Sequence, residues 1–208
     1  MFKKIALLLA VLALSLPCPI AASAAKKPAA QVVAAIADAV AKSPAIEAAF
    51  TISRNGGKPA SGTALIQGRK FTLDLPGFRT WFDGKTQWTY SEDAAEVNVT
   101  EPTPDELAES NPLTIVTASA AHCAARRLEA AAGTDKVELK PEGKSAFRKA
   151  VVTSDASTNF PKEIVVTMDD GSTVVIRFTS MKKVAKKPDS RFRYVKTMIP
   201  SARVVDLR

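Results

Sequence analysis

The chain has 208 residues, of which 46% are hydrophobic, and a formal net charge of +8 at pH 7. This length suits one domain with a single hydrophobic core. Only Cys18 and Cys123 are present, and Cys18 falls in the leader described next, so the composition excludes a disulfide-built secreted scaffold.

The first 24 residues have the pattern of a secretory signal peptide. Two lysines come first, an apolar stretch covers 5–16, and small residues at 22–24 precede a polar segment. Cleavage after Ala24 or Ala25 leaves a domain of residues 25–208, which we expect in the bacterial periplasm. Nucleic acid is not an expected partner of an exported domain, even a basic one.

Two alternatives to a cleaved leader remain open. A retained anchor helix is one, although the apolar stretch is short for a bilayer span. Lipidation of Cys18 is the other, and the lipobox motif requires a leucine-like residue three positions before the cysteine and a small residue just before it. Because Ser15 and Pro17 occupy those positions, the sequence favours the signal peptide.

One amphipathic helix and a series of strands are predicted for the domain. Over 28–42, four aliphatic residues share one helical face, and Ser43-Pro44 ends that pattern. The period then changes to two, and Asn55-Gly56-Gly57, Asp83-Gly84 and Asp169-Asp170-Gly171 predict hairpin turns. The predicted strands cover 46–54, 63–67, 71–75, 80–82, 86–90, 96–100, 136–140, 147–154, 163–168, 173–179 and 202–207.

A helical pair is predicted midway along these strands, from Pro104 to about Cys123. Thr103 and Glu106 have the spacing of a capping box, with Pro104 at the first helical position. Asn111-Pro112 repeats this start signal. The sequence therefore predicts one α+β domain with a long antiparallel sheet, an N-terminal helix and two inserted helices.

Catalytic and metal chemistry have few candidates in this sequence. His122 is the only histidine, and Cys123 follows it directly on a predicted helix, where neighbouring residues point in different directions. Asp169 and Asp170 are explained by their hairpin turn, and no glycine-rich phosphate loop is present. We expect no catalytic site, no metal and no cofactor, and an enzyme acting on lipid is the least favoured function.

Three of the four tryptophan and tyrosine rings fall within residues 81–90. Period two places Trp88 and Tyr90 on one face of a strand, and Val97 and Val99 share a face on the next strand. Two interpretations are open: the rings belong to a closed core, or they line an apolar cavity. The pattern alone favours core.

One dense basic stretch, SMKKVAKKPDSRFR, covers residues 180–193. Its simplest interpretation is a solvated loop, which the sequence favours. Attraction to an anionic membrane surface or to an acidic partner is the alternative.

A set of short motifs runs in order through nearly all of the domain. The motifs are WFDGKTQW (81–88), EVNV (96–99), PTPDEL (102–107), NPL (111–113), PDS-x-F (188–192) and the closing V-x-DLR (204–208). No single motif is diagnostic, but the ordered set resembles the LolA family, the periplasmic carriers of outer-membrane lipoproteins.

The resemblance implies a strongly curved, half-open β-barrel with the inserted helices as a lid. It also implies an apolar cavity that shelters the acyl chains of a lipoprotein. Trp88 and Tyr90 would then be an aromatic pair in the cavity wall. The candidate cavity and lid residues are Phe50, Ile52, Phe71, Leu73, Trp81, Trp88, Tyr90, Val97, Val99, Leu113, Ile115, Val116, Ile164, Val166, Met168, Val174, Ile176 and Phe178.

The function that this resemblance implies is that of a monomeric periplasmic chaperone. It would receive lipidated proteins from an inner-membrane ABC-type transporter and deliver them to the outer membrane, where a dedicated receptor stays an open question. A lipid-sensing or regulatory binding module with the same half-barrel is the alternative.

One departure from the family pattern concerns the lid. In the family, an arginine after the first hairpin pins the lid, and the matching stretch here is Gln67-Gly68-Arg69. Arg69 comes one position late, which on a strand points it to the opposite face. The arginine latch is therefore not carried over to this chain.

Overall fold

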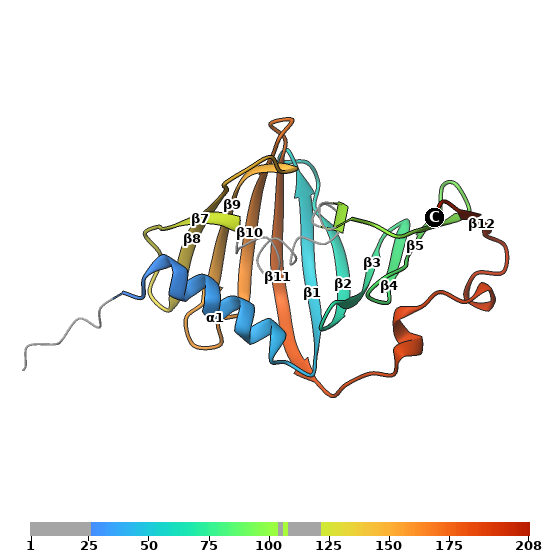
Figure 1. Cartoon of the computed structure of the whole chain (residues 1–208), viewed down its shortest axis with the longest axis horizontal. Coiled ribbons are helices and arrows are strands. Elements are labelled where there is room, and N and C mark those ends of the chain that lie inside the picture. The colour runs from blue at the N-terminus through green and yellow to red at the C-terminus, as the bar shows by residue number, and fades with distance from the viewer. Residues whose placement is uncertain (1–25, 104–105, 108–121) are drawn as a thin grey trace, which may run out of the picture.

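The computed structural model describes residues 26–103, 106–107 and 122–208. Within these ranges the chain forms one α-helix and twelve strands, and all twelve strands belong to one sheet (Figure 1). The predicted signal peptide, and the predicted lid residues Leu113, Ile115 and Val116, lie outside the described residues.

The elements follow the predicted order closely. Helix α1 spans Ala29–Ala41, and the short 3-10 helices η2 (Asp189–Phe192) and η3 (Lys196–Met198) lie between the last two strands. The strands are β1 (Ala45–Arg54), β2 (Ala60–Gln67), β3 (Lys70–Leu75), β4 (Phe78–Phe82), β5 (Gln87–Ser91), β6 (Glu96–Thr100), β7 (Cys123–Arg127), β8 (Thr134–Pro141), β9 (Phe147–Asp155), β10 (Pro161–Met168), β11 (Thr173–Val184) and β12 (Arg203–Asp206). In the described part of the chain, no helix has the length and apolar character needed to span a membrane.

The predicted face of α1 is buried against the sheet. Val32, Val33, Ile36 and Val40 are the buried residues of this helix, which confirms the period seen in the sequence. Beyond the helix end, the Ser43 hydroxyl donates a hydrogen bond to the Ala39 carbonyl at 2.6 Å. The chain then turns directly into β1.

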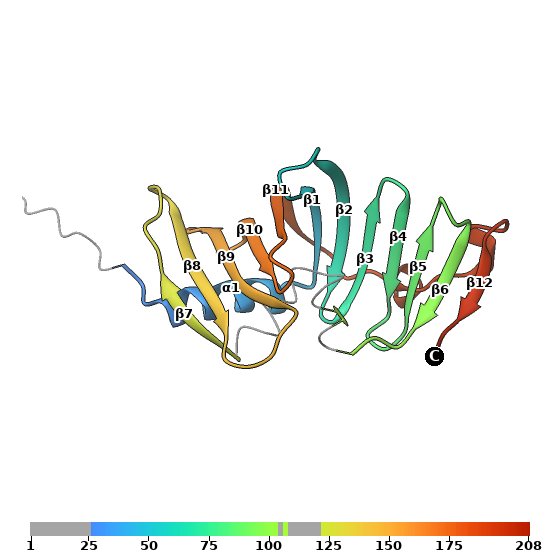
Figure 2. The same cartoon turned by 90° about the horizontal axis from the view of Figure 1, so that it is seen from above.

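The sheet is built from two antiparallel runs that join at its centre. Strands β1 to β6 form the predicted meander, β7 to β11 form a second run, and β11 pairs with β1. β12 is the exception, because it pairs in parallel with β6, with Val204 beside Val97. The sheet curls but does not close, so β7 and β12 remain its two edges (Figure 2).

The two faces of the sheet carry separate apolar clusters. The face that contacts α1, called here the helix face, includes Ile46 and Phe71 and holds the main core. The opposite face, called here the C-terminal face, includes Ala45 and Trp81 and is partly covered by residues 192–202. Figure 1 shows this last segment, orange to red, running from the foot of β11 to β12.

The prediction of a helix as far as Cys123 is wrong, because Cys123 is the first residue of strand β7. Ala124 lies opposite Lys140 and Arg126 opposite Glu138 in the ladder with β8. The sequence Ala-Ala-Arg-Arg has good helix propensity, but the ladder and an ion pair of 3.1 Å between Arg126 and Glu138 outweigh this weak local preference.

The start of the inserted helical segment follows the predicted capping box. The Glu106 carboxylate accepts from the backbone N–H of Thr103 at 2.7 Å, and the Thr103 hydroxyl accepts from the Glu106 N–H at 3.4 Å. The Leu107 N–H donates to the Thr103 carbonyl at 3.0 Å. The rest of the predicted helical pair, including Asn111-Pro112, lies outside the described residues.

The predicted Asp83-Gly84 turn also holds the C-terminal segment. The Asp83 carboxylate accepts from the N–H groups of Lys85 at 3.1 Å and Thr86 at 3.0 Å, and it pairs with Arg193 Nε at 3.0 Å. Burial raises the pKa of this carboxyl, but the two N–H donors and the Arg193 guanidinium outweigh burial, so the pKa of Asp83 lies below its ordinary value.

Acid is therefore expected to weaken the attachment at Asp83. A depressed pKa gives stability that is present above the unfolded value of about 3.9 and is lost as the pH falls through the folded pKa. We expect Asp83→Asn to lower the unfolding temperature at pH 7, with a difference from wild type that shrinks below about pH 4. Thermal unfolding from pH 7 to pH 3 measures this, with Asp93→Asn in the exposed β5–β6 turn as control. A difference in unfolding temperature between wild type and Asp83→Asn that stays constant with pH would contradict this role of the Asp83 charge.

Candidate functional site

Ten of the eighteen predicted site residues share the helix face of the sheet. The register places Ile52 opposite Ile176 and Phe50 opposite Phe178 across the β1–β11 pair. Leu73 joins this face through β2, where it lies opposite Ala64. The ten residues are Phe50, Ile52, Phe71, Leu73, Ile164, Val166, Met168, Val174, Ile176 and Phe178.

These ten residues divide equally between core and accessible surface. Phe50, Phe71, Ile164, Val166 and Ile176 are buried, so packing alone accounts for them. The other five are half-buried and present apolar atoms to solvent on the same face. We call these five the helix-face patch: Ile52, Leu73, Met168, Val174 and Phe178.

The patch lies on strands away from the main contacts of α1, which packs against β7 and β8. The Phe178 ring lies beside the buried Phe50 ring, with centroids 6.2 Å apart. All five side chains of the patch are uncharged, so this surface favours an apolar ligand over a polar one. Leu107, from the inserted segment, is buried in the main core and so reaches the same face of the sheet.

Gly62 allows a close approach of two apolar side chains beside the patch. A Cβ atom at this position would lie 2.7 Å from Phe50 Cζ, 2.7 Å from Leu75 Cδ2 and 2.8 Å from the carbonyl oxygen of Asp74. The absence of a side chain therefore lets Phe50 and Leu75 approach each other across β2. A glycine inside a strand is a usable sequence signal for such a close approach.

Sequence reasoning missed two further apolar residues on this face. Leu75 is half-buried and follows Leu73 by two positions, so period two could have found it. Phe78 lies opposite Leu75 in the β3–β4 pair and is 51% exposed. The alternation of apolar and polar residues did not reveal Phe78, because the Pro76-Gly77 turn interrupts that alternation between β3 and β4.

Five other predicted residues lie on the C-terminal face. Trp81 packs at 5.5 Å between ring centroids against Tyr194, and Val97 joins the same cluster. Trp88 and Tyr90 pack against this cluster from strand β5, and Val99 lies opposite Trp88 on β6. The structure therefore does not bring these five residues together with the helix-face patch, and acyl binding by them stays a prediction.

Two hollows border the C-terminal face, and the larger one also reaches Phe50, Leu75 and Phe78 of the helix face. One, of about 800 Å³, lies between the β1–β3 strands and Ile199, and the other, of about 770 Å³, lies beside Lys187 and Met198. Asp74 and Arg79 line both hollows and form an ion pair of 2.5 Å with each other. These hollows contain more polar groups than the helix-face patch.

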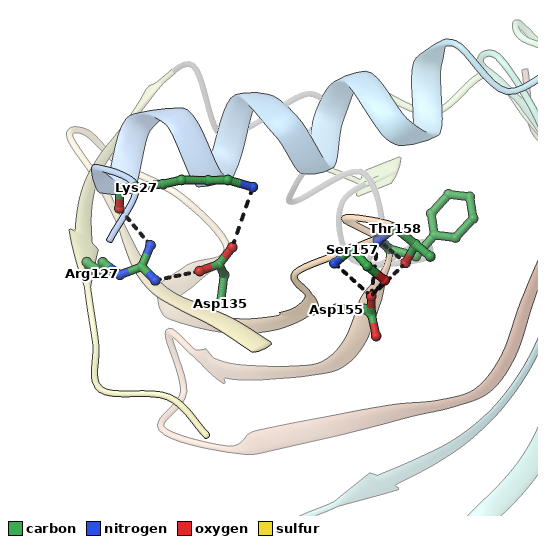
Figure 3. Close-up of polar contacts among 7 residues, drawn as sticks. Lys27, Arg127, Asp135, Asp155, Ser157 and Thr158 are labelled. Carbon is green, nitrogen blue, oxygen red and sulfur yellow. Dashed lines mark hydrogen bonds and ion pairs between the residues drawn. The ribbon is translucent and has the colours of Figure 1, made fainter. Parts of the chain in front are cut away.

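A polar clamp holds the start of α1 on the edge of the sheet (Figure 3). Arg127 donates to the Lys27 carbonyl at 2.6 Å and to the Asp135 carboxylate at 2.5 Å. Lys27 Nζ lies 3.9 Å from the other Asp135 oxygen, and the Asp135 side chain is only 9% exposed. The clamp fixes the start of α1 against β7 and β8.

Figure 3 also shows a tight turn between β9 and β10. One Asp155 oxygen accepts from the N–H groups of Ser157 and Thr158, both at 3.0 Å. The Ser157 hydroxyl, these N–H donors and Lys162 hold the pKa of Asp155 far below its ordinary value. These bonds are local to the turn, which leads into Phe160 in the main core.

The histidine and cysteine singled out in the sequence lack an activated arrangement. His122 is exposed and Cys123 is half-buried at the start of β7. Burial, with the nearby Glu142 carboxylate, raises the pKa of the Cys123 thiol. A raised pKa disfavours the thiolate, which is the nucleophilic form of cysteine.

Comparisons with known proteins give a family and a fold. The sequence model of the family described as "Outer membrane lipoprotein carrier protein LolA" matches residues 20–171. No curated protein matches the chain. The matched residues include α1 and strands β1 to β10, and they end before β11 and the C-terminal segment.

Similar solved structures come from several bacteria. An uncharacterized conserved protein from Thermus thermophilus has a TM-score of 0.58 and 12% identity, covering 86% of this chain and 98% of that one. A DUF1329 family protein from Desulfovibrio piger has a TM-score of 0.50 and 12% identity over 84% of this chain and 100% of that one. A LolA superfamily protein from Nitrosomonas europaea has a TM-score of 0.44 and 12% identity, over 81% and 99%.

Proposed function

The chain belongs to the LolA family of outer membrane lipoprotein carrier proteins, and on this premise we propose that it is a periplasmic carrier that binds the acyl chains of lipoproteins on its helix face. The observation that supports this proposal most directly is the helix-face patch, with its half-buried and uncharged side chains. No catalytic step is part of the proposal.

Acyl chains suit this surface for energetic reasons. Each methylene removed from water contributes about 0.8 kcal/mol, so a long chain exposed to water is strongly unfavourable. A carrier must nevertheless release its cargo. In the free protein, the side chains of the patch already bury part of their surface. Only the remaining exposed area can contact an acyl chain, so the favourable binding free energy is moderate.

The proposed route is the one that the sequence resemblance implies. The carrier would receive lipidated proteins from an inner-membrane ABC-type transporter and deliver them to the outer membrane as a monomer. Leu107, a described residue near the start of the predicted lid, is buried against the helix face. The identity of the cargo would be set by contacts beyond the acyl chains.

Native mass spectrometry of residues 25–208 with a triacylated lipopeptide tests the proposal. We expect a one-to-one complex with the lipidated peptide and none with the same peptide without its acyl chains. Equal binding of the two peptides would show that the peptide and not the lipid is recognised. Binding of neither peptide would remove the acyl-carrier function.

A further inference from the structure

The positive charge of this protein is concentrated at its C-terminal end. Residues 180–208 contain nine lysines and arginines and two aspartates, so they carry a formal charge of +7 out of the +8 of the whole chain. The remaining residues are almost neutral. The basic stretch found in the sequence is thus part of a larger basic region that lies beyond the residues matched by the family.

The basic region is not a simple solvated loop. Lys182 and Lys183 lie in strand β11, and Phe192 anchors the following segment with its side chain fully buried against Ala45 and Leu65. The cations are therefore held in fixed places on the folded domain. Their positions, and not only their number, determine what they can contact.

Only some of these cations are neutralised by acidic residues of the sheet. Lys187 pairs with Glu47 at 3.1 Å, and Arg203 pairs with Glu96. Within the described ranges, no carboxylate lies at ion-pair distance from Lys182, Lys186 or Arg191. A charged group from outside the molecule can therefore approach these three residues without displacing an internal partner.

Two of these free cations border the same hollow on the C-terminal face. Lys182 and Arg191 line the hollow of about 770 Å³, together with Trp81, Leu65 and Met198. Its edge is thus basic, and its wall contains aromatic and aliphatic atoms. This combination suits an amphiphilic ligand that carries negative charge.

Exposed apolar side chains accompany the basic residues. Five large hydrophobic side chains of the described residues are exposed, and all but Phe78 lie in the C-terminal segment and β12: Val195 at 51%, Met198 at 46%, Val204 at 45% and Leu207 at 61%. Lys196, Arg203 and Arg208 lie among them in the sequence. Figure 1 shows the ribbon of this segment running outside the strands of the sheet.

We propose that this C-terminal surface docks on the anionic headgroup layer of a membrane. Lysines and arginines near such a surface are attracted to its negative charge, and neighbouring apolar side chains enter the headgroup region. A membrane fits better than an acidic protein, because the exposed side chains of Val195, Val204 and Leu207 are aliphatic. Protein hot spots instead favour tryptophan, tyrosine and arginine in enclosed pockets.

Co-sedimentation with vesicles tests the proposal. We expect residues 25–208 to bind phosphatidylcholine vesicles that contain phosphatidylglycerol and not to bind vesicles of phosphatidylcholine alone, with binding weakened by salt. The double variant Lys182→Glu, Arg191→Glu is expected to weaken the partition by about tenfold or more. Lys144→Glu, Lys149→Glu changes the net charge equally at exposed lysines elsewhere and should bind like wild type.

Three results would overturn the proposal: no binding to anionic vesicles, equal weakening by both double variants, or retention by an acidic peptide matrix without retention by vesicles. The first variant is also expected to bind the triacylated lipopeptide like wild type. Because the two assays use different faces of the sheet, failure of vesicle docking can be distinguished from failure of the acyl-carrier function.

Discussion

Replacing Ile52 with aspartate is expected to lower the affinity for a triacylated lipopeptide by about a hundredfold, which corresponds to about 2.7 kcal/mol. Ile52 is half-buried on the helix face, opposite Ile176 of β11. An acyl chain on this surface would cover the introduced carboxylate and remove it from water, which is strongly unfavourable without a partner. Titration of a fluorescent lipopeptide measures the change.

Thr51→Asp is the matched control for this experiment. Thr51 is the preceding residue of the same strand, so its side chain points to the other face, where it lines the hollow of about 800 Å³. We expect this variant to keep wild-type affinity. If Thr51→Asp weakened binding and Ile52→Asp did not, the acyl chains would lie on the C-terminal face, and Trp88 and Tyr90 would regain the role that the sequence suggested for them.

Gly62→Val is expected to lower the free energy of unfolding by about 3 kcal/mol or more. Its Cβ would lie 2.8 Å from the Asp74 carbonyl oxygen, which belongs to a paired strand and cannot move without disturbing the ladder. Phe50 and Leu75 would also have to leave their positions beside the helix-face patch. Urea unfolding followed by circular dichroism measures the loss.

Gly143→Val provides the control for steric conflict. Gly143 has no positive φ, and a Cβ placed there meets no atom within 4 Å. Its replacement should change stability by less than about 0.5 kcal/mol, as is usual at open surface positions. Similar losses in both variants would mean that Gly62 is needed for chain flexibility and not for the close approach of Phe50 and Leu75.

Much of the local structure could be predicted from the sequence. The four aliphatic residues of α1, the alternation in β1 and the Asp-Gly turns each carry a direct physical signal, and the structure confirms them. β7 could not be found in this way, because Cys123 and the alanines after it have no strand pattern of their own. Their conformation depends on β8, which is distant in the sequence.

The assignment of aromatic rings to faces was the least predictable feature. Four strand pairs separate Phe50 on β1 from Trp88 on β5. The number of residues in each intervening turn determines whether the two side chains lie on the same face of the sheet. One residue more or less in any turn moves every later side chain to the opposite face. Period two showed correctly that Trp88 and Tyr90 lie together, but it could not relate them to Phe50.

The position of β11 constrains how this protein can fold. β11 is made late but pairs at the centre of the sheet, and Thr179 donates to the carbonyl of Ala49 from 130 residues further along the chain. Until β11 arrives, β1 has one unpaired edge, which is a template for aggregation. Contacts of such high sequence separation also slow folding. The two halves of the sheet can therefore join only after β11, near the end of the chain, is available to pair with β1.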